Sequence, residues 1–310
     1  APDAEPSPET PSAITLGVIP KSTSGEFWET VEKGANAGAA AAGVEMRWEG
    51  TVTETEFAEQ NKIIENMINL GVDGIALAPL NRKAQAKMVT QAVDAGIPVV
   101  VFDSAVDGEA HTSFVATDNK KGGSVGADYM LSMLDGKGKI MVLRFVQGTG
   151  STEARAEGFI ETATAGGLEI VDDPYPDLGT IEGSKKVAAD TLEGYVTDGK
   201  LELDGIFACN LVATLGMASA LDDLRKGGIE VDVKFVGFDT SKKLVQGVQD
   251  GSIHGLVAQD PQKMGKLAVE VLTKVVAGEP VDKMIDTGVS LVTKAALADD
   301  AALRALVGLE

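Results

Sequence analysis

The sequence predicts an α/β fold with two matched lobes of parallel sheet, because one strand pattern occurs twice. In the first half, the apolar run 72–77 is followed by a second run whose end reads Phe-Asp-Ser at 102–104. In the second half, the run 203–208 is followed by one that ends in Phe-Asp-Thr at 238–240. Such short runs are typical of buried parallel strands, and ligands bind beyond their carboxyl ends. We therefore expect one ligand between two lobes.

Strand and helix signals alternate through the first half. Apolar stripes at 3.6-residue spacing predict helices, and Gly43 and Gly71 stand where helix-ending glycines are common. The first stripe contains Phe27, Val31, Ala35 and Gly38. We expect strands at 14–19, 44–48, 72–77, 99–102 and 114–117, and helices at 26–42, 55–70 and 82–95.

The same alternation restarts in the second half. Strands separated by helices form βαβ units with parallel sheets and right-handed crossovers. We expect helices at 122–134, 152–165, 182–195, 212–225, 242–250 and 264–276, with strands at 139–145, 169–171, 205–208, 234–238 and 255–258.

Composition excludes several classes of function. A formal charge of −20 argues against nucleic acid as a partner, because binding to phosphates needs clustered Lys and Arg. No apolar run approaches the ~18–20 residues of a membrane span. The single Cys209 cannot form an internal disulfide, and His111 and His254 are too far apart in the chain to suggest a metal site. We expect neither a metal nor a cofactor.

Residues 1–12 have the composition of a disordered linker. They contain four prolines and several acids, with almost nothing apolar. No charged and apolar leader precedes them, so we expect that any signal peptide is already absent. A tether to a membrane lipid would fit such a linker, although the cysteine it requires is not in this sequence.

Six short motifs follow one another along the chain: Glu-Phe-Trp at 26–28, Phe-Asp at 102–103, Val-Ala-Thr-Asp-Asn at 115–119, Arg-Ala-Glu-Gly-Phe at 155–159, Val-Gly-Phe-Asp at 236–239 and Ala-Gln-Asp-Pro at 258–261. In this order and spacing, the chain from Ala13 onward resembles type I periplasmic solute-binding proteins of the ribose-binding kind, which serve sugar ABC importers. The resemblance implies two Rossmann-like lobes joined by a three-segment hinge.

The resemblance also implies where the chain passes between the lobes, near 117–118, 259–260 and 287–288. The N-terminal lobe would comprise 13–117 and 260–287, and the C-terminal lobe 118–259 and 288–310.

Two aspartates are the first candidates for ligand contact. Asp103 and Asp239 follow strands, and an ionised carboxylate can accept hydrogen bonds from two neighbouring hydroxyls. The alternative role for each is a turn or helix cap. Arg155 would complement them, because its planar guanidinium offers five donors, although a surface ion pair with a nearby glutamate is the alternative. The glycine-rich stretch before it is not a Walker A motif.

Amide and aromatic side chains complete the expected site. Asn210 and Gln259 can both donate and accept, as sugar hydroxyls require. Phe27 and Trp28 begin the first helix, and an aromatic ring can cover the C–H face of a sugar. Of the two, Phe27 lies on the helix stripe and is the one expected in the core.

The first loop departs from the ribose-binding branch. Ile-Pro-Lys at 19–21 resembles the rhamnose- and autoinducer-binding branch, which carries a ligand-contacting lysine there. Lys21 and the neighbouring Glu26 are therefore included in the expected site. Leu178 stands where the ribose branch has a stacking aromatic residue, and Ser104 where it has a second arginine.

These residues predict a binding protein rather than an enzyme. The leading hypothesis is a monomeric periplasmic or extracytoplasmic carrier that closes on a sugar or polyol and delivers it to a membrane permease. A dehydrogenase is excluded because no Gly-x-Gly-x-x-Gly follows the first strand, and no Ser–His or Cys–His arrangement suggests nucleophilic catalysis. A chemoreceptor or quorum-signal protein is the alternative. The effector core of a sugar-responsive repressor would need a helix-turn-helix, which the acidic start does not supply.

Overall fold

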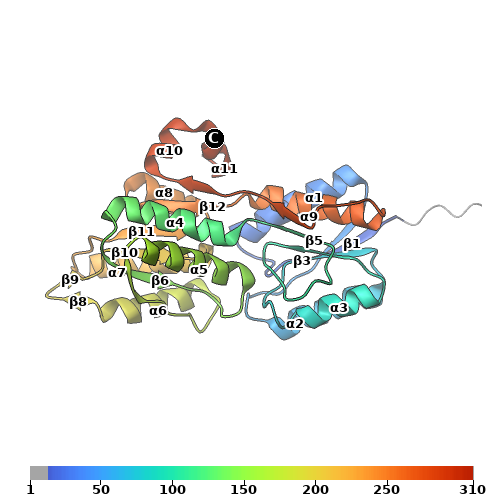
Figure 1. Cartoon of the computed structure of the whole chain (residues 1–310), viewed down its shortest axis with the longest axis horizontal. Helices are drawn as coiled ribbons and strands as arrows, with labels where there is room; N and C mark the ends of the chain where they lie inside the picture. Colours follow the sequence, from blue (N-terminus) through green and yellow to red (C-terminus); the bar gives the residue numbers. More distant parts are fainter. Residues whose placement is uncertain (1–12, 310) are drawn as a thin grey trace, which may run out of the picture.

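Two six-stranded sheets form the two lobes of the protein (Figure 1). The structure, a computed structural model, describes residues 13–309. The first sheet has the strand order β13-β5-β4-β3-β1-β2, and all its neighbouring strands are parallel. Its strands are β1 (Thr15–Ile19), β2 (Glu45–Trp48), β3 (Gly74–Leu77), β4 (Val99–Phe102), β5 (Ser113–Ala116) and β13 (Met284–Asp286).

The second sheet repeats this plan with one strand reversed. Its order is β14-β12-β11-β10-β6-β7, and only β14 runs antiparallel to its neighbour. The strands are β6 (Lys139–Leu143), β7 (Glu169–Asp172), β10 (Gly205–Ala208), β11 (Lys234–Phe238), β12 (Gly255–Ala258) and β14 (Ser290–Val292). The expected α/β fold with two lobes of mostly parallel sheet is confirmed.

Helices cover both faces of the first sheet because its strands are apolar on both sides. Successive strand residues point to opposite faces, so Val100 and Phe102 join one core cluster while Val99 and Val101 join another. The helices α1 (Glu26–Ala42) and α9 (Pro261–Val276) complete the first cluster, and α2 (Phe57–Leu70) and α3 (Ala86–Asp94) complete the second.

The second sheet is covered in the same way. One face packs against α4 (Asn119–Leu134) and α5 (Gly150–Ala165). The other packs against α6 (Ile181–Glu193), α7 (Leu211–Lys226) and α8 (Lys242–Asp250), together with the short helices α10 (Lys294–Asp299) and α11 (Ala301–Leu306).

The chain passes between the sheets three times. The passages lie between β5 and α4, between β12 and α9, and between β13 and β14. Figure 1 shows the result: the late helix α9 lies beside the early helix α1. The first and third passages are hydrogen-bonded to each other. The hydroxyls of Thr117 and Thr287 are 3.2 Å apart, and the backbone N–H of Asp118 donates to the side chain of Asp286.

Several expected element ends were wrong, and local capping explains two of them. The third helix begins at Ala86 rather than 82, because the Asn81 side chain accepts from the backbone N–H groups of Lys83 and Ala84 and holds a turn. The fourth helix begins at Asn119 rather than 122, because the Asp118 carboxylate caps it. The strand expected to reach 145 ends at Leu143.

The remaining edge differences are small, and some elements were not expected at all. The helix expected from 264 already begins at Pro261, and the helix expected from 152 at Gly150. The unexpected elements are β13, β14, α10, α11 and a hairpin of β8 (Val196–Thr197) and β9 (Lys200–Leu201). The linker expected at 1–12 lies outside the described residues.

Glycines allow helices α1 and α9 to pack closely. A Cβ atom added at Gly34 would lie 1.9 Å from the carbonyl oxygen of Gln262, and one added at Gly265 would lie 2.0 Å from that of Val31. Because both neighbours are backbone atoms, the helices would have to move apart.

We expect Gly34→Ala to destabilise the protein by about 1–3 kcal/mol, measured by urea unfolding. Helix propensity alone would favour alanine, so the sign of the change tests the packing directly. Asn36→Ala, at an exposed position of the same helix, is the control and should raise stability by up to about 0.7 kcal/mol through helix propensity alone. A Gly34→Ala protein as stable as the wild type would contradict this account.

Candidate functional site

A cavity of about 370 Å³ lies between the two lobes. Its polar side chains follow the carboxyl ends of strands in both sheets: Lys21 after β1, Asp103 after β4, Asn210 after β10, Asp239 after β11 and Gln259 after β12. Parallel strands present their carboxyl ends at one edge, so facing sheets bring these residues together. The volume falls within the range of small-molecule sites.

The two aspartates share an unusual backbone conformation. Asp103 has φ 59° and Asp239 has φ 69°, in the left-handed region that few non-glycine residues occupy. Aspartate tolerates this region better than most residues do. Both side chains are buried, so each strand ends in a sharp turn that places a carboxylate at the cavity.

Lys21 forms an ion pair with Asp103 within the N-terminal lobe. The Lys21 Nζ atom lies 2.6 Å from Asp103 Oδ2, and both side chains are almost fully buried. The same ammonium donates to the hydroxyl of Ser151, which belongs to the other sheet's lobe, at 3.0 Å. Asp103 Oδ2 has no well-oriented hydrogen bond, so it retains capacity to accept one. Lys21 is therefore a buried residue of the site and not an exposed lysine of the first loop.

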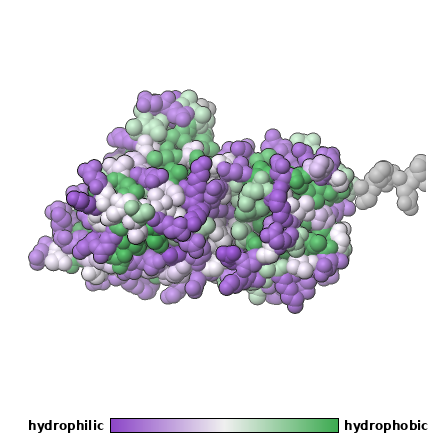
Figure 2. All heavy atoms as spheres, viewed as in Figure 1, coloured by the Kyte–Doolittle hydropathy of each residue, from purple (hydrophilic) through white to green (hydrophobic). Residues whose placement is uncertain are grey.

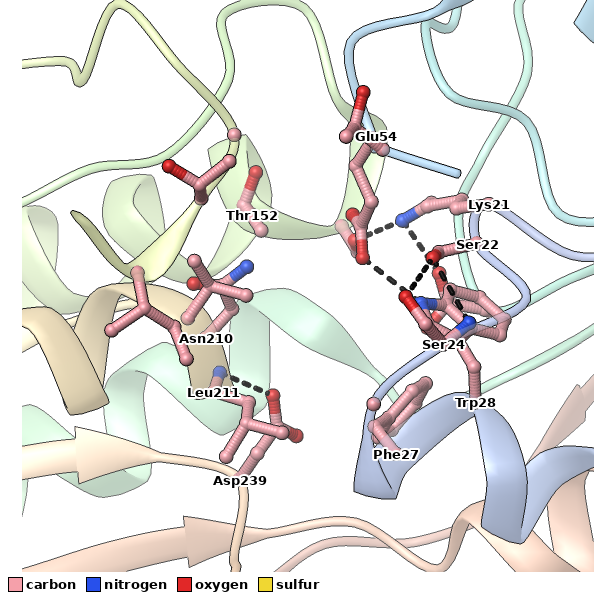
Figure 3. A pocket seen from close by; sticks show the side chains of 18 of the residues that line it. Lys21, Ser22, Ser24, Phe27, Trp28, Glu54, Thr152, Asn210, Leu211 and Asp239 are labelled. Carbon is pink, nitrogen blue, oxygen red and sulfur yellow. Dashed lines mark hydrogen bonds and ion pairs between the residues drawn. The ribbon is translucent and has the colours of Figure 1, made fainter. Parts of the chain in front are cut away.

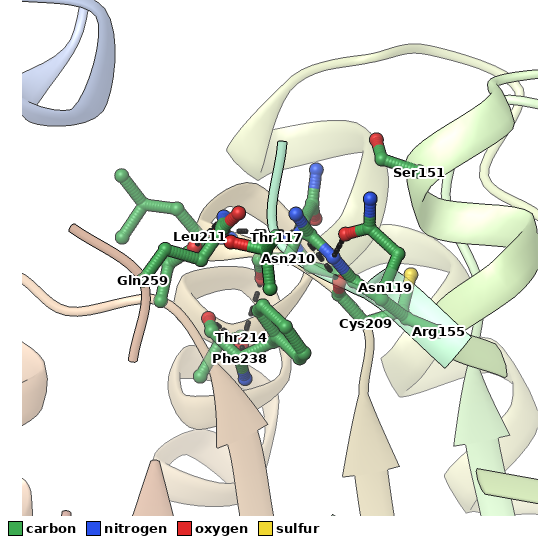
Figure 4. A network of polar contacts seen from close by, with 12 residues as sticks. Thr117, Asn119, Ser151, Arg155, Cys209, Asn210, Leu211, Thr214, Phe238 and Gln259 are labelled. Atoms are coloured by element: carbon green, nitrogen blue, oxygen red, sulfur yellow. Dashed lines mark hydrogen bonds and ion pairs between the residues drawn. The ribbon is translucent and has the colours of Figure 1, made fainter. Parts of the chain in front are cut away.

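Arg155 occupies the centre of a buried polar network (Figure 4). Its Nε donates to Asn119 Oδ1 at 2.8 Å, and one terminal nitrogen donates to the carbonyl oxygen of Cys209 at 3.2 Å. That nitrogen lies 3.7 Å from Asp239 Oδ2, and the guanidinium carbon is 3.9 Å from the ring centroid of Phe238. The side chain is not on the surface, so the alternative of a surface ion pair is wrong.

Asp239 is held by donors on both oxygens. Gln259 Nε2 donates to Oδ1 at 2.7 Å, and the backbone N–H of Leu211 donates to Oδ2 at 2.9 Å. Burial raises the pKa of Asp239, while Arg155 and the Gln259 hydrogen bond act in the opposite direction. The Oε1 atom of Gln259 is buried without a partner. It is therefore an acceptor available at the cavity.

Asn210 has a structural role as well as a place at the cavity. Its side-chain oxygen caps α7 by accepting from the backbone N–H of Ala213 at 2.9 Å. Its amide N–H groups and the second lone pair of its side-chain oxygen remain for another partner.

The aromatic pair Phe27 and Trp28 lines the cavity from the start of α1 (Figure 3). The rings meet edge to face with centroids 5.1 Å apart. The expectation that Phe27 is the core residue was wrong: Trp28 is 5% exposed and packs on Phe102, whereas Phe27 is only partly buried. Val31, Ala35 and Gly38 of the expected stripe are buried, but Trp28 takes the place expected for Phe27. The buried face of α1 is wider than expected, since it also includes Gly34 and Ala39.

Glu54 is a cavity residue that the sequence did not reveal. It lies on the segment between β2 and α2, and its Oε1 accepts from the indole N–H of Trp28 at 2.9 Å (Figure 3). Burial raises the pKa of Glu54, and Lys21 and the Trp28 hydrogen bond partly offset this. The local sequence Thr-Val-Thr-Glu-Thr-Glu indicates only a polar loop, so no sequence signal distinguishes this glutamate from its neighbours.

Glu26 does not line the central cavity. It borders a second hollow of about 630 Å³, between the starts of α1 and α9 and the end of α11. There its Oε2 accepts from the backbone N–H of Lys242 at 3.4 Å. The other eight expected site residues line the central cavity, together with hydroxyl and apolar residues that were not expected: Ser22, Ser24, Thr53, Ser151, Thr152, Thr180, Val52, Ile181, Leu211 and Val212.

The described residues contain no group of three or more His, Cys, Asp or Glu side chains that could hold a metal ion. Within residues 13–309, no helix has the length and apolar character needed to cross a membrane.

Comparison with known proteins identifies the family. Residues 16–280 match the model of the periplasmic binding protein domain. The chain belongs to this family. Its members are solute-binding proteins and not enzymes, so the matched fold and cavity are those of a periplasmic solute-binding protein.

Several curated proteins and solved structures match this chain over nearly their whole length. A D-ribose/D-allose-binding protein of Pseudomonas aeruginosa is 30% identical over 92% of this chain and 90% of its own. A ribose import binding protein of Bacillus subtilis is 28% identical over 91% and 88%. A carbohydrate transporter solute-binding protein of Agrobacterium radiobacter, solved with D-arabinose, has a TM-score of 0.88, 30% identity and coverage of 96% and 100%. An ABC transporter solute-binding protein of Agrobacterium vitis, solved with D-fucose, has a TM-score of 0.86 and 33% identity. That match covers 93% of this chain and 98% of the other.

Cys209 lies directly behind the cavity, and we expect it to be chemically inert in the folded protein. Its side chain is fully buried, and burial raises the pKa of its thiol to about 12. The thiolate that reacts with disulfide reagents is therefore absent near pH 8. Ellman's reagent should find no thiol in the native protein and one per chain in denaturant. One reactive thiol in the native protein would contradict the burial of Cys209.

Proposed function

We propose that this protein is the substrate-binding component of an ABC importer and that it encloses a sugar or polyol between its lobes. The main support is that two buried aspartates, one from each lobe, line the same cavity, and that each has a cation beside it. Carboxylates accept from neighbouring hydroxyls, and Arg155 donates to the oxygens that carboxylates cannot serve.

The rest of the cavity supports a polyhydroxyl ligand. Gln259 Oε1 is a buried acceptor without a hydrogen-bond donor, and such a group costs free energy until a ligand pairs it. Phe27 offers an aromatic face for the C–H side of a ring. The ligands in the two solved relatives, D-arabinose and D-fucose, are molecules of this kind.

The relatives favour import over the other uses of this fold. The Bacillus subtilis relative is named an import binding protein, which supports a membrane permease as partner and a periplasmic or otherwise extracytoplasmic location. A lipid anchor outside the described residues is compatible with that location. The cavity is completed by the two lobes of one chain, which supports a monomer.

We infer that the lobes comprise 13–117 with 260–287, and 118–259 with 288–310, and that they close as rigid bodies on three connecting segments. Contacts across one side of the cavity support closure: the backbone N–H of Ser151 donates to the hydroxyl of Ser104 at 2.8 Å, and the Thr149 hydroxyl donates to the carbonyl oxygen of Leu80 at 3.1 Å. Ligand contacts from both lobes would favour this closed arrangement.

Asp103→Asn and Asp239→Asn should each weaken binding about ten- to a hundredfold, because each removes a charge-assisted hydrogen bond. The ligand is first found by a thermal-shift screen of pentoses, hexoses, deoxy-sugars and alditols, and affinities are then measured by calorimetry. Asparagine tolerates positive φ, so the turns should persist. Asp198→Asn, exposed and also at positive φ (50°), is the matched control. Unchanged affinity in both site variants would refute this site.

Binding should also make the protein more compact. Small-angle scattering with the ligand found in that screen should give a smaller radius of gyration than without it, since lobe closure shortens the molecule. A sugar that produces no thermal shift serves as the control. Identical scattering at saturating ligand would argue against hinge closure.

A further inference from the structure

The charged groups around the cavity do not balance. Among the residues that the structure describes, four carboxylates and two cations, Lys21 and Arg155, line it. Asp103 and Asp239 are buried at the cavity and Glu54 is half-buried there, whereas Glu182 is exposed at its rim. The interior therefore has one more negative than positive group.

Both cations are already assigned to the aspartates. Lys21 Nζ is 2.6 Å from Asp103, and the Arg155 guanidinium is 3.7 Å from Asp239. Arg155 also donates to Asn119 and to the carbonyl oxygen of Cys209, which fixes it away from the opposite wall. Glu54 is the carboxylate without an ion pair of its own, and the charge of Lys21 acts on it only from a longer distance.

Glu54 has only an uncharged donor among its hydrogen-bond partners, the indole N–H of Trp28 at 2.9 Å. Withdrawing even part of a carboxylate from water without an ion-pair partner costs free energy. The same cost is visible in the pKa of Glu54, which burial raises. A ligand that closes the cavity would remove more water from this group, so it must bring either a cation or a proton.

The surroundings of Glu54 suit a cation. Phe27 and Trp28 line the same side of the cavity, and aromatic faces attract ammonium groups (Figure 3). The rim carboxylate of Glu182 and the formal charge of −20 give a negative potential that attracts cationic solutes.

The geometry points to Glu54 as the residue that selects a ligand carrying a protonated amine, so that the solute is an amino sugar or an aminated polyol. This inference rests on the proposed sugar- or polyol-binding function and specifies its ligand class. The ring hydroxyls would be held by the two aspartates and Arg155, as proposed above, while the ammonium group pairs with the free oxygen of Glu54 beside the aromatic pair.

The test compares matched ligands on matched variants. Calorimetry at pH 7.5 measures D-glucose, D-galactose, D-mannose, D-allose and D-ribose, each against its amino-deoxy derivatives. The wild type should bind the best amine about ten- to a hundredfold more tightly than the parent sugar. Glu54→Gln keeps an oxygen for the Trp28 N–H and removes only the charge, so the ratio of amine affinity to parent-sugar affinity should fall to about one.

Glu49→Gln is the control, because it removes the same charge from the start of the same connecting segment at an exposed position outside the cavity. The amine preference should survive in this variant. Loss of the preference in both variants would mean that overall charge, not contact with Glu54, is responsible, and would overturn the inference.

Three other outcomes would overturn it. If parent sugars bind as tightly as every amine, the amine inference fails while the sugar-binding function stands. The same holds if a parent sugar binds with uptake of about one proton, measured in buffers of different ionisation enthalpy, because a proton then neutralises Glu54. If no sugar, polyol or amine binds, both the inference and the proposed function fail.

Discussion

The burial of charged side chains between the lobes is the constraint on which the rest of this structure depends. Lys21, Asp103, Arg155 and Asp239 are each less than 10% exposed, and taking such groups out of water costs several kcal/mol apiece. The cost is tolerable only where each charge meets an opposite one and its remaining donors and acceptors are paired. Two mostly parallel sheets with facing carboxyl edges provide that arrangement, because the ends of β1, β4, β10, β11 and β12 each place one polar residue in the same space.

Asn119 joins this charge network to the passage between the lobes. It lies two residues after Thr117, accepts from Arg155 at 2.8 Å and donates to the backbone carbonyl of Asp103 at 3.3 Å. The ends of β4 and β5, the start of α4 and the arginine of α5 are therefore parts of one hydrogen-bonded unit. A shift at the first passage between the lobes would be transmitted directly to both halves of the cavity.

The parts of the fold that could be predicted are those in which the local pattern of apolar residues matches the burial of those residues in the folded protein. Val99 to Phe102 is apolar at every position and is buried on both faces, so its sequence alone predicts a central strand. By contrast, β13 and β14 have three residues each, and of these only Val292 is buried. They are strands only because β5 and β12 offer open edges for them to pair with, which is a property of distant residues.

The sequence by itself determined the two-lobed α/β fold and the family, because repeated apolar runs and strand-end aspartates are local features that survive in one chain read alone. It also named eight residues that the tertiary structure gathers around one cavity. Only the tertiary structure decided that Trp28 and not Phe27 enters the core, that Glu26 borders a different hollow, and that Glu54 faces the ligand space. The physical reason is that burial, ion pairing and the loss of solvation depend on which groups distant in the sequence come close in space. The local sequence of a polar loop does not indicate which groups those are.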